Sequence, residues 1–214
     1  MRFWRRRLPP DFIVFGLGNP GPGYAATRHN LGFMAVDALH GMLGAPRLVH
    51  RWSSETFEAE VQPSLVVQLA ELKPEAVAGQ EPVRLLAARP QTFMNRSGRA
   101  VAQTVNANRS VPFAVISDDV NLPWGRLRLR RGGGAGGHKG LASIISELGG
   151  FEDFPRIRIG VGGGELAELS GYVLEPMGAE ELAQARRFAR AAAVKALELA
   201  ACGYERASSS SFVI

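Results

Sequence analysis

One segment of the chain carries a histidine and another carries two aspartates, and together these residues could perform acid–base chemistry. His29 lies between a loop rich in Gly and Pro (residues 18–23) and a segment with helical spacing. Asp118 and Asp119 follow an apolar run typical of a buried strand, and strand ends of this kind often carry catalytic carboxylates in α/β proteins. A carboxylate beside His29 would fix its tautomer and raise its basicity. Such a pair, without a nucleophilic Ser or Cys, indicates general-base activation of water.

Other sets of catalytic residues are absent from the sequence or incomplete. The single cysteine, Cys202, excludes an internal disulfide and a multi-cysteine metal site. No H-x-x-x-H or H-E-x-x-H spacing occurs, so no metal is expected, and no G-x-S-x-G elbow supports a serine hydrolase. His138 lies beside a glycine-rich loop, whereas His40 and His50 have no such context. Taken alone, His29 fits a structural histidine, and the two aspartates also fit a turn.

Two glycine-rich loops are similar to phosphate-binding motifs but do not match them. Residues 16–21 fit the dinucleotide pattern G-x-G-x-x-G, yet Pro20 and Pro22 would interrupt the helix that this motif must start. The second loop, GGGAGGHKG (132–140), lacks the Gly-Lys-Ser/Thr of a Walker loop. The first loop is better interpreted as the wall of a pocket at the end of a strand. A nucleotide-binding enzyme remains an alternative function.

Positive charge is concentrated in two segments. The chain has 25 Lys and Arg against 20 Asp and Glu, a net charge of +5. In both segments arginines alternate with Leu or Ile, so on a strand they share one face. Two basic strand faces suit a polyphosphate backbone, with a solvated edge as the alternative. The candidate phosphate contacts are Arg126, Arg128, Arg130 and Arg131, and the second segment contains Arg156 and Arg158.

The elements that must position these residues alternate between strands and helices, which predicts one α/β domain. Apolar runs predict strands over 12–17, 112–117 and 156–161, and extended runs lie within 55–70 and 81–88. Helical spacing predicts helices over 30–43, 97–106, 139–148 and 179–202. The composition, 46% apolar and 21% charged, is that of a globular protein. No apolar run is long enough for a membrane span and no signal peptide is recognisable, which fits a cytoplasmic protein.

The predicted domain has a boundary near each end of the chain. Residues 1–11 are expected to form a loose basic arm, 12–203 the α/β domain, and 204–214 a flexible tail. The stretch between the extended runs, with Pro74, Gly79 and Pro82, is interpreted as a turn or insertion, and the segment 62–82 as unusually long.

Five blocks of the sequence resemble the bacterial-type peptidyl-tRNA hydrolase family, in the order in which that family has them. They are FGLGNPGPGYAATRHNLGFMAVDAL (15–39), RPQTFMNRSGRAV (89–101), ISDDVNLPWGRLRLRRGGGAGGHKGLASIISELGG (116–150), FPRIRIGVG (154–162) and, more weakly, GYVLEPM (171–177). The resemblance implies hydrolysis of the ester that joins a peptide to the 3′ end of tRNA. It also implies a single α/β domain with a twisted mixed sheet flanked by helices, no cofactor, a peptidyl-tRNA partner, no membrane and a monomer.

The resemblance assigns roles to residues that match the family's motifs. His29 matches the general base that activates water, and Asp118 matches the acid that supports it. Asn19 matches the asparagine that distinguishes blocked from free aminoacyl-tRNA. Three further residues match positions that contact tRNA or peptide, and the last also lies near the attacked carbonyl: Tyr24, Phe93 and Asn95.

One departure from the family affects the expected site. Lys139 stands where the family usually has an asparagine that helps to bind substrate and water. Lysine donates hydrogen bonds but cannot accept them. It could place a cation near the oxyanion or terminal phosphate, or weaken His29 as a base through like-charge repulsion. The alternative function is therefore a non-catalytic RNA-binding relative of the family.

Overall fold

A single mixed β-sheet organises the chain, described in a computed structural model over residues 8–162, 169–210 and 212. Within these residues the sheet has seven strands in the order β2-β3-β4-β1-β5-β7-β6. The central pairs β4–β1, β1–β5 and β5–β7 are parallel, and the outer pairs are antiparallel. The strands are β1 (Phe12–Gly16), β2 (Val49–Arg51), β3 (Ser54–Val61), β4 (Val83–Pro90), β5 (Phe113–Asp119), β6 (Leu127–Arg130) and β7 (Arg156–Gly160).

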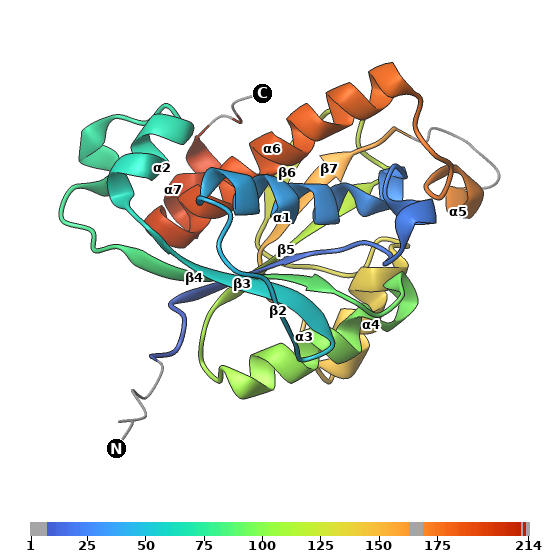
Figure 1. Cartoon of the computed structure of the whole chain (residues 1–214), viewed down its shortest axis with the longest axis horizontal. Coiled ribbons are helices and arrows are strands. Elements are labelled where there is room, and N and C mark those ends of the chain that lie inside the picture. The colour runs from blue at the N-terminus through green and yellow to red at the C-terminus, as the bar shows by residue number, and fades with distance from the viewer. Residues whose placement is uncertain (1–7, 163–168, 211, 213–214) are drawn as a thin grey trace.

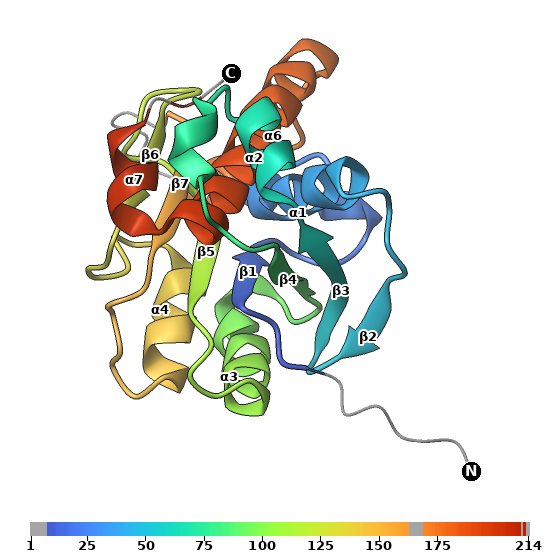
Figure 2. The same cartoon turned by 90° about the vertical axis from the view of Figure 1, so that its left-hand side faces the viewer.

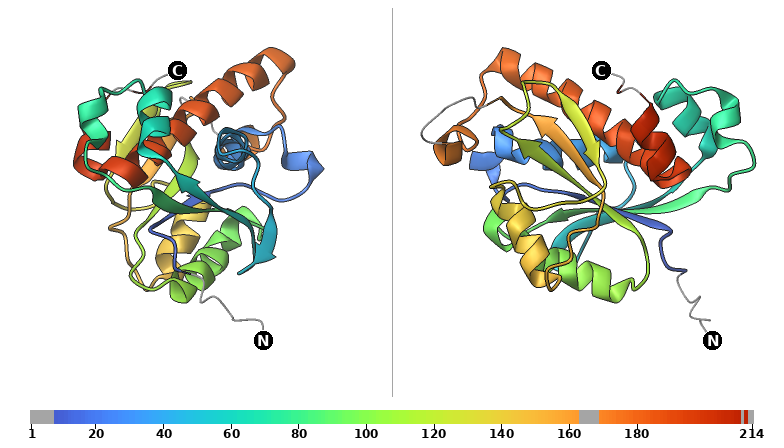
Figure 3. Two further views of the ribbon diagram at one scale, coloured as in Figure 1. Left: turned by 60° about the vertical axis from the view of Figure 1, so that its left-hand side comes forward. Right: turned by 180° about the vertical axis from the view of Figure 1, so that it is seen from behind.

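Helices cover both faces of the sheet (Figure 1). Helices α1 (Leu31–Met42) and α6 (Ala179–Cys202) pack on one face and α3 (Ser97–Ala107) and α4 (Lys139–Glu147) on the other, which gives three layers (Figures 2 and 3). The sheet is visibly twisted in the end view of Figure 2. The expected α/β class, with a twisted mixed sheet flanked by helices, is therefore confirmed. None of the helices in the described ranges combines the length and apolarity needed to cross a membrane.

The central strands are buried on both faces because helices lie above and below them. Every residue of β1 and β5 is buried, and both begin as continuous apolar runs, as expected for parallel strands in the middle of a layered sheet. Strand β5 continues past the predicted end to include Asp118 and Asp119. Two carboxylates are thus placed in the buried carboxyl end of the sheet.

The start of α1 lies against the end of β1 through two glycines. A Cβ on Gly32 would lie 2.3 Å from Leu17 N, and a Cβ on Gly16 would lie 2.1 Å from Gly32 O. Only glycine permits this backbone-to-backbone contact, because any side chain would overlap the neighbouring main chain. The contact holds the 3-10 turn η2 (Arg28–Asn30), directly before α1, over the end of the sheet.

One segment between β3 and β4 differs from its expected conformation. The run LVVQLA (65–70) is predicted to be extended, but α2 (Pro63–Leu69) is a helix, followed by the turn η3 (Pro74–Val77). Short apolar runs do not distinguish a strand from a buried helix, and Pro63 suits the first turn of a helix.

The predicted flexible tail also differs from the structure where it is described. Residues Tyr204–Ser209 form helix α7, and Ala207 is buried. Lys195 of α6, itself buried, donates to Ala207 O at 3.1 Å and to Ser210 Oγ at 2.6 Å. Of the predicted N-terminal arm, residues 1–7 lie outside the described residues.

Candidate active site

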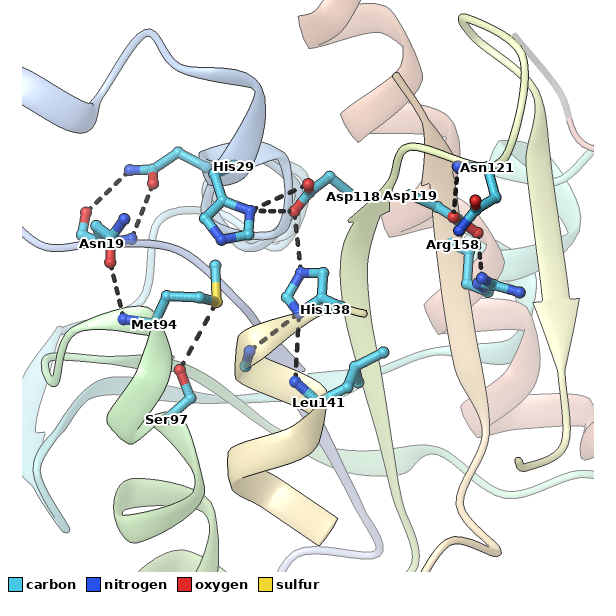
Figure 4. Close-up of polar contacts among 12 residues, drawn as sticks. Asn19, His29, Met94, Ser97, Asp118, Asp119, Asn121, His138, Leu141 and Arg158 are labelled. Atoms are coloured by element: carbon cyan, nitrogen blue, oxygen red, sulfur yellow. Dashed lines mark hydrogen bonds and ion pairs between the residues drawn. The ribbon is translucent and has the colours of Figure 1, made fainter. Parts of the chain in front are cut away.

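His29 and Asp118 form a buried pair at the carboxyl end of the sheet. His29 Nδ1 lies 2.9 Å from Asp118 Oδ1 and 3.0 Å from Oδ2 (Figure 4). The two residues are only 8% and 3% exposed. The His29 backbone N–H donates to Val173 O at 2.9 Å, which fixes the turn that carries the imidazole. Because an ionised Asp118 accepts a hydrogen from Nδ1, Nε2 is left as the basic nitrogen.

His138 is the second histidine on the same carboxylate. Its Nε2 lies 3.1 Å from Asp118 Oδ1. As the N-cap of α4 it accepts the backbone N–H groups of Gly140 and Leu141 at Nδ1, at 3.1 and 3.2 Å. Those two donors require Nδ1 to be unprotonated, so Nε2–H donates to Asp118. The sequence places His138 beside the glycine-rich loop without indicating this role; its position directly before a predicted helix is the signal that could have found it.

The pKa of the Asp118 carboxyl is held well below its usual range. Burial alone would raise this pKa, but the charges and hydrogen bonds of His138 and His29 outweigh it. Asp118 therefore stays ionised and keeps both imidazoles oriented. The ligand atoms of the three residues lie within 4.8 Å of one another, near enough for a metal ion. In this network, however, the nitrogens that face Asp118 carry hydrogens, which a metal would have to displace.

Hydrogen bonds fix the position of Asn19 and leave its side-chain NH2 group available to a substrate. Its backbone N–H donates to Asn30 Oδ1 at 2.8 Å, and Asn30 Nδ2 donates to Asn19 O at 3.0 Å. The Asn19 side-chain Oδ1 accepts the Met94 backbone N–H at 2.8 Å. Its Nδ2 is the group left to donate, which suits a carbonyl oxygen. Asn30 was missed at the level of the sequence, because nothing in its spacing indicates which backbone it holds.

A cavity of about 800 Å³ brings the predicted residues together. One wall is apolar: the Tyr24 and Phe93 rings meet edge to face with centroids 6.2 Å apart, and Leu174 and Val173 line the same cavity. Phe93 is 54% exposed. The predicted catalytic and substrate-binding residues that line the cavity are Asn19, Tyr24, His29, Phe93, Asn95, Asp118 and Lys139.

The arginines of the first basic segment lie on the edge strand β6 or directly beside its ends. Arg126, Arg128 and Arg130 are all exposed, as the alternation predicts. We call these three residues the arginine row. Arg131 beyond them is partly neutralised, with its guanidinium nitrogens 3.7 Å from Asp153 and 3.6 Å from Glu205.

The second basic segment does not form the exposed face that its alternation predicts. Arg156 is 3% exposed, donates to Gly134 O at 2.7 Å and to Glu152 O at 3.2 Å, and lies over the Phe154 ring. The alternation gives the face on which Arg156 lies but not the loop that covers it. Arg156 therefore stabilises the glycine-rich loop through its hydrogen bond to Gly134 O.

Arg158 and Asp119 form a separate ion pair at the cavity wall. Arg158 lines the cavity, and its Nη2 lies 2.5 Å from Asp119 Oδ2. Asp119 also accepts the Asn121 backbone N–H at 3.0 Å (Figure 4). The two neighbouring aspartates therefore have different partners, and only Asp118 meets His29.

Replacing His138 by asparagine is expected to keep its contact with the start of α4 and to remove its contact with Asp118. Asparagine is a good N-cap, so α4 and the melting temperature should be preserved, but its shorter side chain cannot hold Asp118. The hydrolysis of peptidyl-tRNA that the resemblance implies should then fall by about tenfold to a hundredfold in kcat. His138→Ala is the comparison, with the same catalytic loss and in addition a lower melting temperature. Unchanged kcat in His138→Asn would exclude this positioning role.

Comparisons with known proteins agree with one another. A family model described as Peptidyl-tRNA hydrolase matches residues 13–212. A peptidyl-tRNA hydrolase of Solidesulfovibrio magneticus is 41% identical over 186 residues, covering 84% of this chain and 82% of the relative. One of Moorella thermoacetica is 44% identical over 170 residues, covering 77% of each. The crystal structure of a variant peptidyl-tRNA hydrolase from Acinetobacter baumannii matches with a TM-score of 0.73 at 30% identity, covering 95% of both chains.

Proposed function

The chain belongs to the peptidyl-tRNA hydrolase family, and we propose that it cleaves the peptidyl-tRNA ester with water activated by His29. The observation that carries this mechanism is the buried His29–Asp118 pair in the wall of the cavity. The same pair argues against the non-catalytic alternative, because an RNA-binding relative has no need of an oriented base. The chain contains the base, the carboxylate that orients it and the donors that an ester hydrolysis requires.

The reaction proceeds through one proton shuttle. His29 Nε2 removes a proton from water while the oxygen attacks the ester carbonyl. Asn19 Nδ2 and the side chain of Asn95 are the donors proposed to hold the carbonyl oxygen as negative charge develops on it. When the bond to the ribose oxygen breaks, the His29 imidazolium returns the proton to that oxygen. Asp118 remains a carboxylate throughout and stabilises the imidazolium.

The tRNA is proposed to lie along the arginine row. Such contacts with phosphate position the RNA without reading its sequence, which suits an enzyme that acts on many tRNAs. The enzyme is then proposed to act in the cytoplasm, where translation supplies peptidyl-tRNA. It is proposed to act as a monomer, because all proposed site residues belong to one chain.

Hydrolysis of N-acetyl-aminoacyl-tRNA by the purified protein, beside Lys139→Asn, tests the proposal. Cleavage by the wild type supports the hydrolase and shows that Lys139 is compatible with catalysis. If only Lys139→Asn cleaves, the wild type is an RNA-binding relative in which Lys139 has replaced a catalytic group. Cleavage by neither protein contradicts the proposed activity.

The affinity for tRNA is expected to fall steeply with salt. Removal of each arginine that binds a phosphate should reduce the slope of log Kd against log salt by about one. The triple variant Arg126→Gln/Arg128→Gln/Arg130→Gln should therefore bind more weakly and with a shallower slope. Filter binding over a series of salt concentrations measures both. The matched control replaces three exposed arginines of α6 away from the cavity, Arg186, Arg187 and Arg190; an equal effect there would contradict a specific arginine row.

A further inference from the structure

The cavity wall beside the turn η4 (Met94–Arg96) carries two cations that take no part in the proton transfers above. Arg96 ends η4 and Lys139 begins α4, and both line the cavity. Both are exposed. In the part of the chain that the structure describes, neither has an anionic partner, whereas Arg158 across the cavity is paired with Asp119. This wall therefore has uncompensated positive charge.

Packing of α4 on η4 brings together the two segments that carry these cations. A Cβ on Gly140 would lie 2.5 Å from Met94 Sδ, so the first turn of α4 directly contacts η4. Lys139 precedes Gly140, and Arg96 follows Met94 by two residues. We call Arg96 and Lys139 together the η4–α4 patch.

The Arg96 end of the patch and the arginine row lie on opposite sides of the reacting centre. The turn η4 follows β4, and the arginine row lies at β6. In the sheet order β4-β1-β5-β7-β6, Asp118 at the end of β5 lies between them, and Lys139 is next to His138, which contacts Asp118. The ester joins tRNA to peptide, so the two parts of the substrate leave the reacting carbon in different directions. If the tRNA lies on the arginine row as proposed, the side left for the peptide is that of Lys139 and η4.

We propose that the η4–α4 patch is a subsite for acidic side chains of the peptide, an inference that rests on the proposed function. Its ligand is a carboxylate on the peptide residue next to the esterified amino acid. Arginine donates two parallel hydrogen bonds to such a group, and lysine adds a point charge. Because both cations are exposed, each ion pair contributes a few-fold at most. The subsite therefore confers a preference for acidic peptides rather than a requirement.

The test compares two substrates that differ in one side chain, the N-acetyl-Glu-Ala and N-acetyl-Gln-Ala esters of the same tRNA. The wild type is expected to cleave the Glu peptide with a kcat/KM roughly threefold to tenfold higher. Added salt should reduce this ratio, because it screens exposed charges. Arg96→Glu/Lys139→Glu should reverse the ratio in favour of the Gln peptide. The control Arg99→Gln removes an exposed cation of α3 that does not line the cavity, and should keep the wild-type ratio.

Each other outcome has a distinct meaning. Equal cleavage of both peptides by the wild type contradicts the subsite and leaves the hydrolase intact. A charge-reversed variant that loses the same factor on both peptides would place a tRNA phosphate at the patch and overturn the assignment to peptide. Absence of cleavage of either peptide by the wild type contradicts the proposed function itself, and the subsite with it.

Discussion

Replacement of His29 by alanine is expected to reduce kcat for peptidyl-tRNA hydrolysis by about 10²- to 10⁴-fold, the usual contribution of a general base. The imidazole is the proposed base, since its Nδ1 is hydrogen-bonded to Asp118 and Nε2 is left as the basic nitrogen. The affinity for tRNA should stay close to that of the wild type, because the arginine row lies on another strand. Single-turnover hydrolysis and filter binding on the same preparations measure the two effects.

His50→Ala is the matched control for His29→Ala. The His50 side chain is 74% exposed on β2 and lies outside the cavity, and its Nε2 is 3.4 Å from Glu55 Oε1. Its loss should leave the rate unchanged. Full activity in a correctly folded His29→Ala, judged by circular dichroism, would refute the proposed mechanism.

Replacement of Asp118 by asparagine is expected to reduce kcat by about 10²- to 10³-fold. The amide has one oxygen to share between two imidazole donors, and its NH2 group would turn an N–H toward one of them. His29 would then lose its preferred tautomer. The double variant His29→Ala/Asp118→Asn should be no slower than His29→Ala alone, because the two residues act as a unit.

The neighbouring carboxylate provides the control, and pH provides a second readout. Asp119→Asn releases Arg158, so it should change KM more than kcat.

The lowered pKa of Asp118 keeps this group ionised as the pH falls below the ordinary carboxyl value. The stability that its pairing contributes is present above that value and is lost only as the pH falls through the lower folded pKa. Protonation of Asp118 should therefore not contribute to a loss of wild-type activity in mild acid, which the pH profile of kcat measures. Additive losses in the double variant, or a loss of activity that follows protonation of Asp118 near the ordinary carboxyl value, would contradict the pairing.

The pairing of His29 with Asp118 was predictable from the resemblance, and the fold explains it, because β1 and β5 are neighbouring parallel strands that end at the same edge of the sheet. The 3.6-residue period likewise indicated α3, α4 and α6 within a few residues. The roles of His138 and Asn30 were not predictable, because they depend on which backbone groups the loops present to them. Arg156 shows a different limit: alternation assigns a residue to a face, but burial depends on what packs there. The packing of α7 involves the buried Ala207 and hydrogen bonds from the buried Lys195, and neither residue has a local pattern that predicts this.

The main-chain contact between Gly16 and Gly32 makes one part of the molecule less tolerant of substitution than another. Any side chain at either glycine would overlap neighbouring backbone, so the junction of β1 and α1, next to the turn that carries His29, accepts no larger residue without a backbone shift. The apolar wall of the cavity includes Phe93 and Leu174, which are 54% and 42% exposed and are therefore constrained by fewer neighbours. Substitutions at that wall are expected to change which peptides are accepted with little effect on the base, whereas a substitution at either glycine is expected to lower the rate for every substrate.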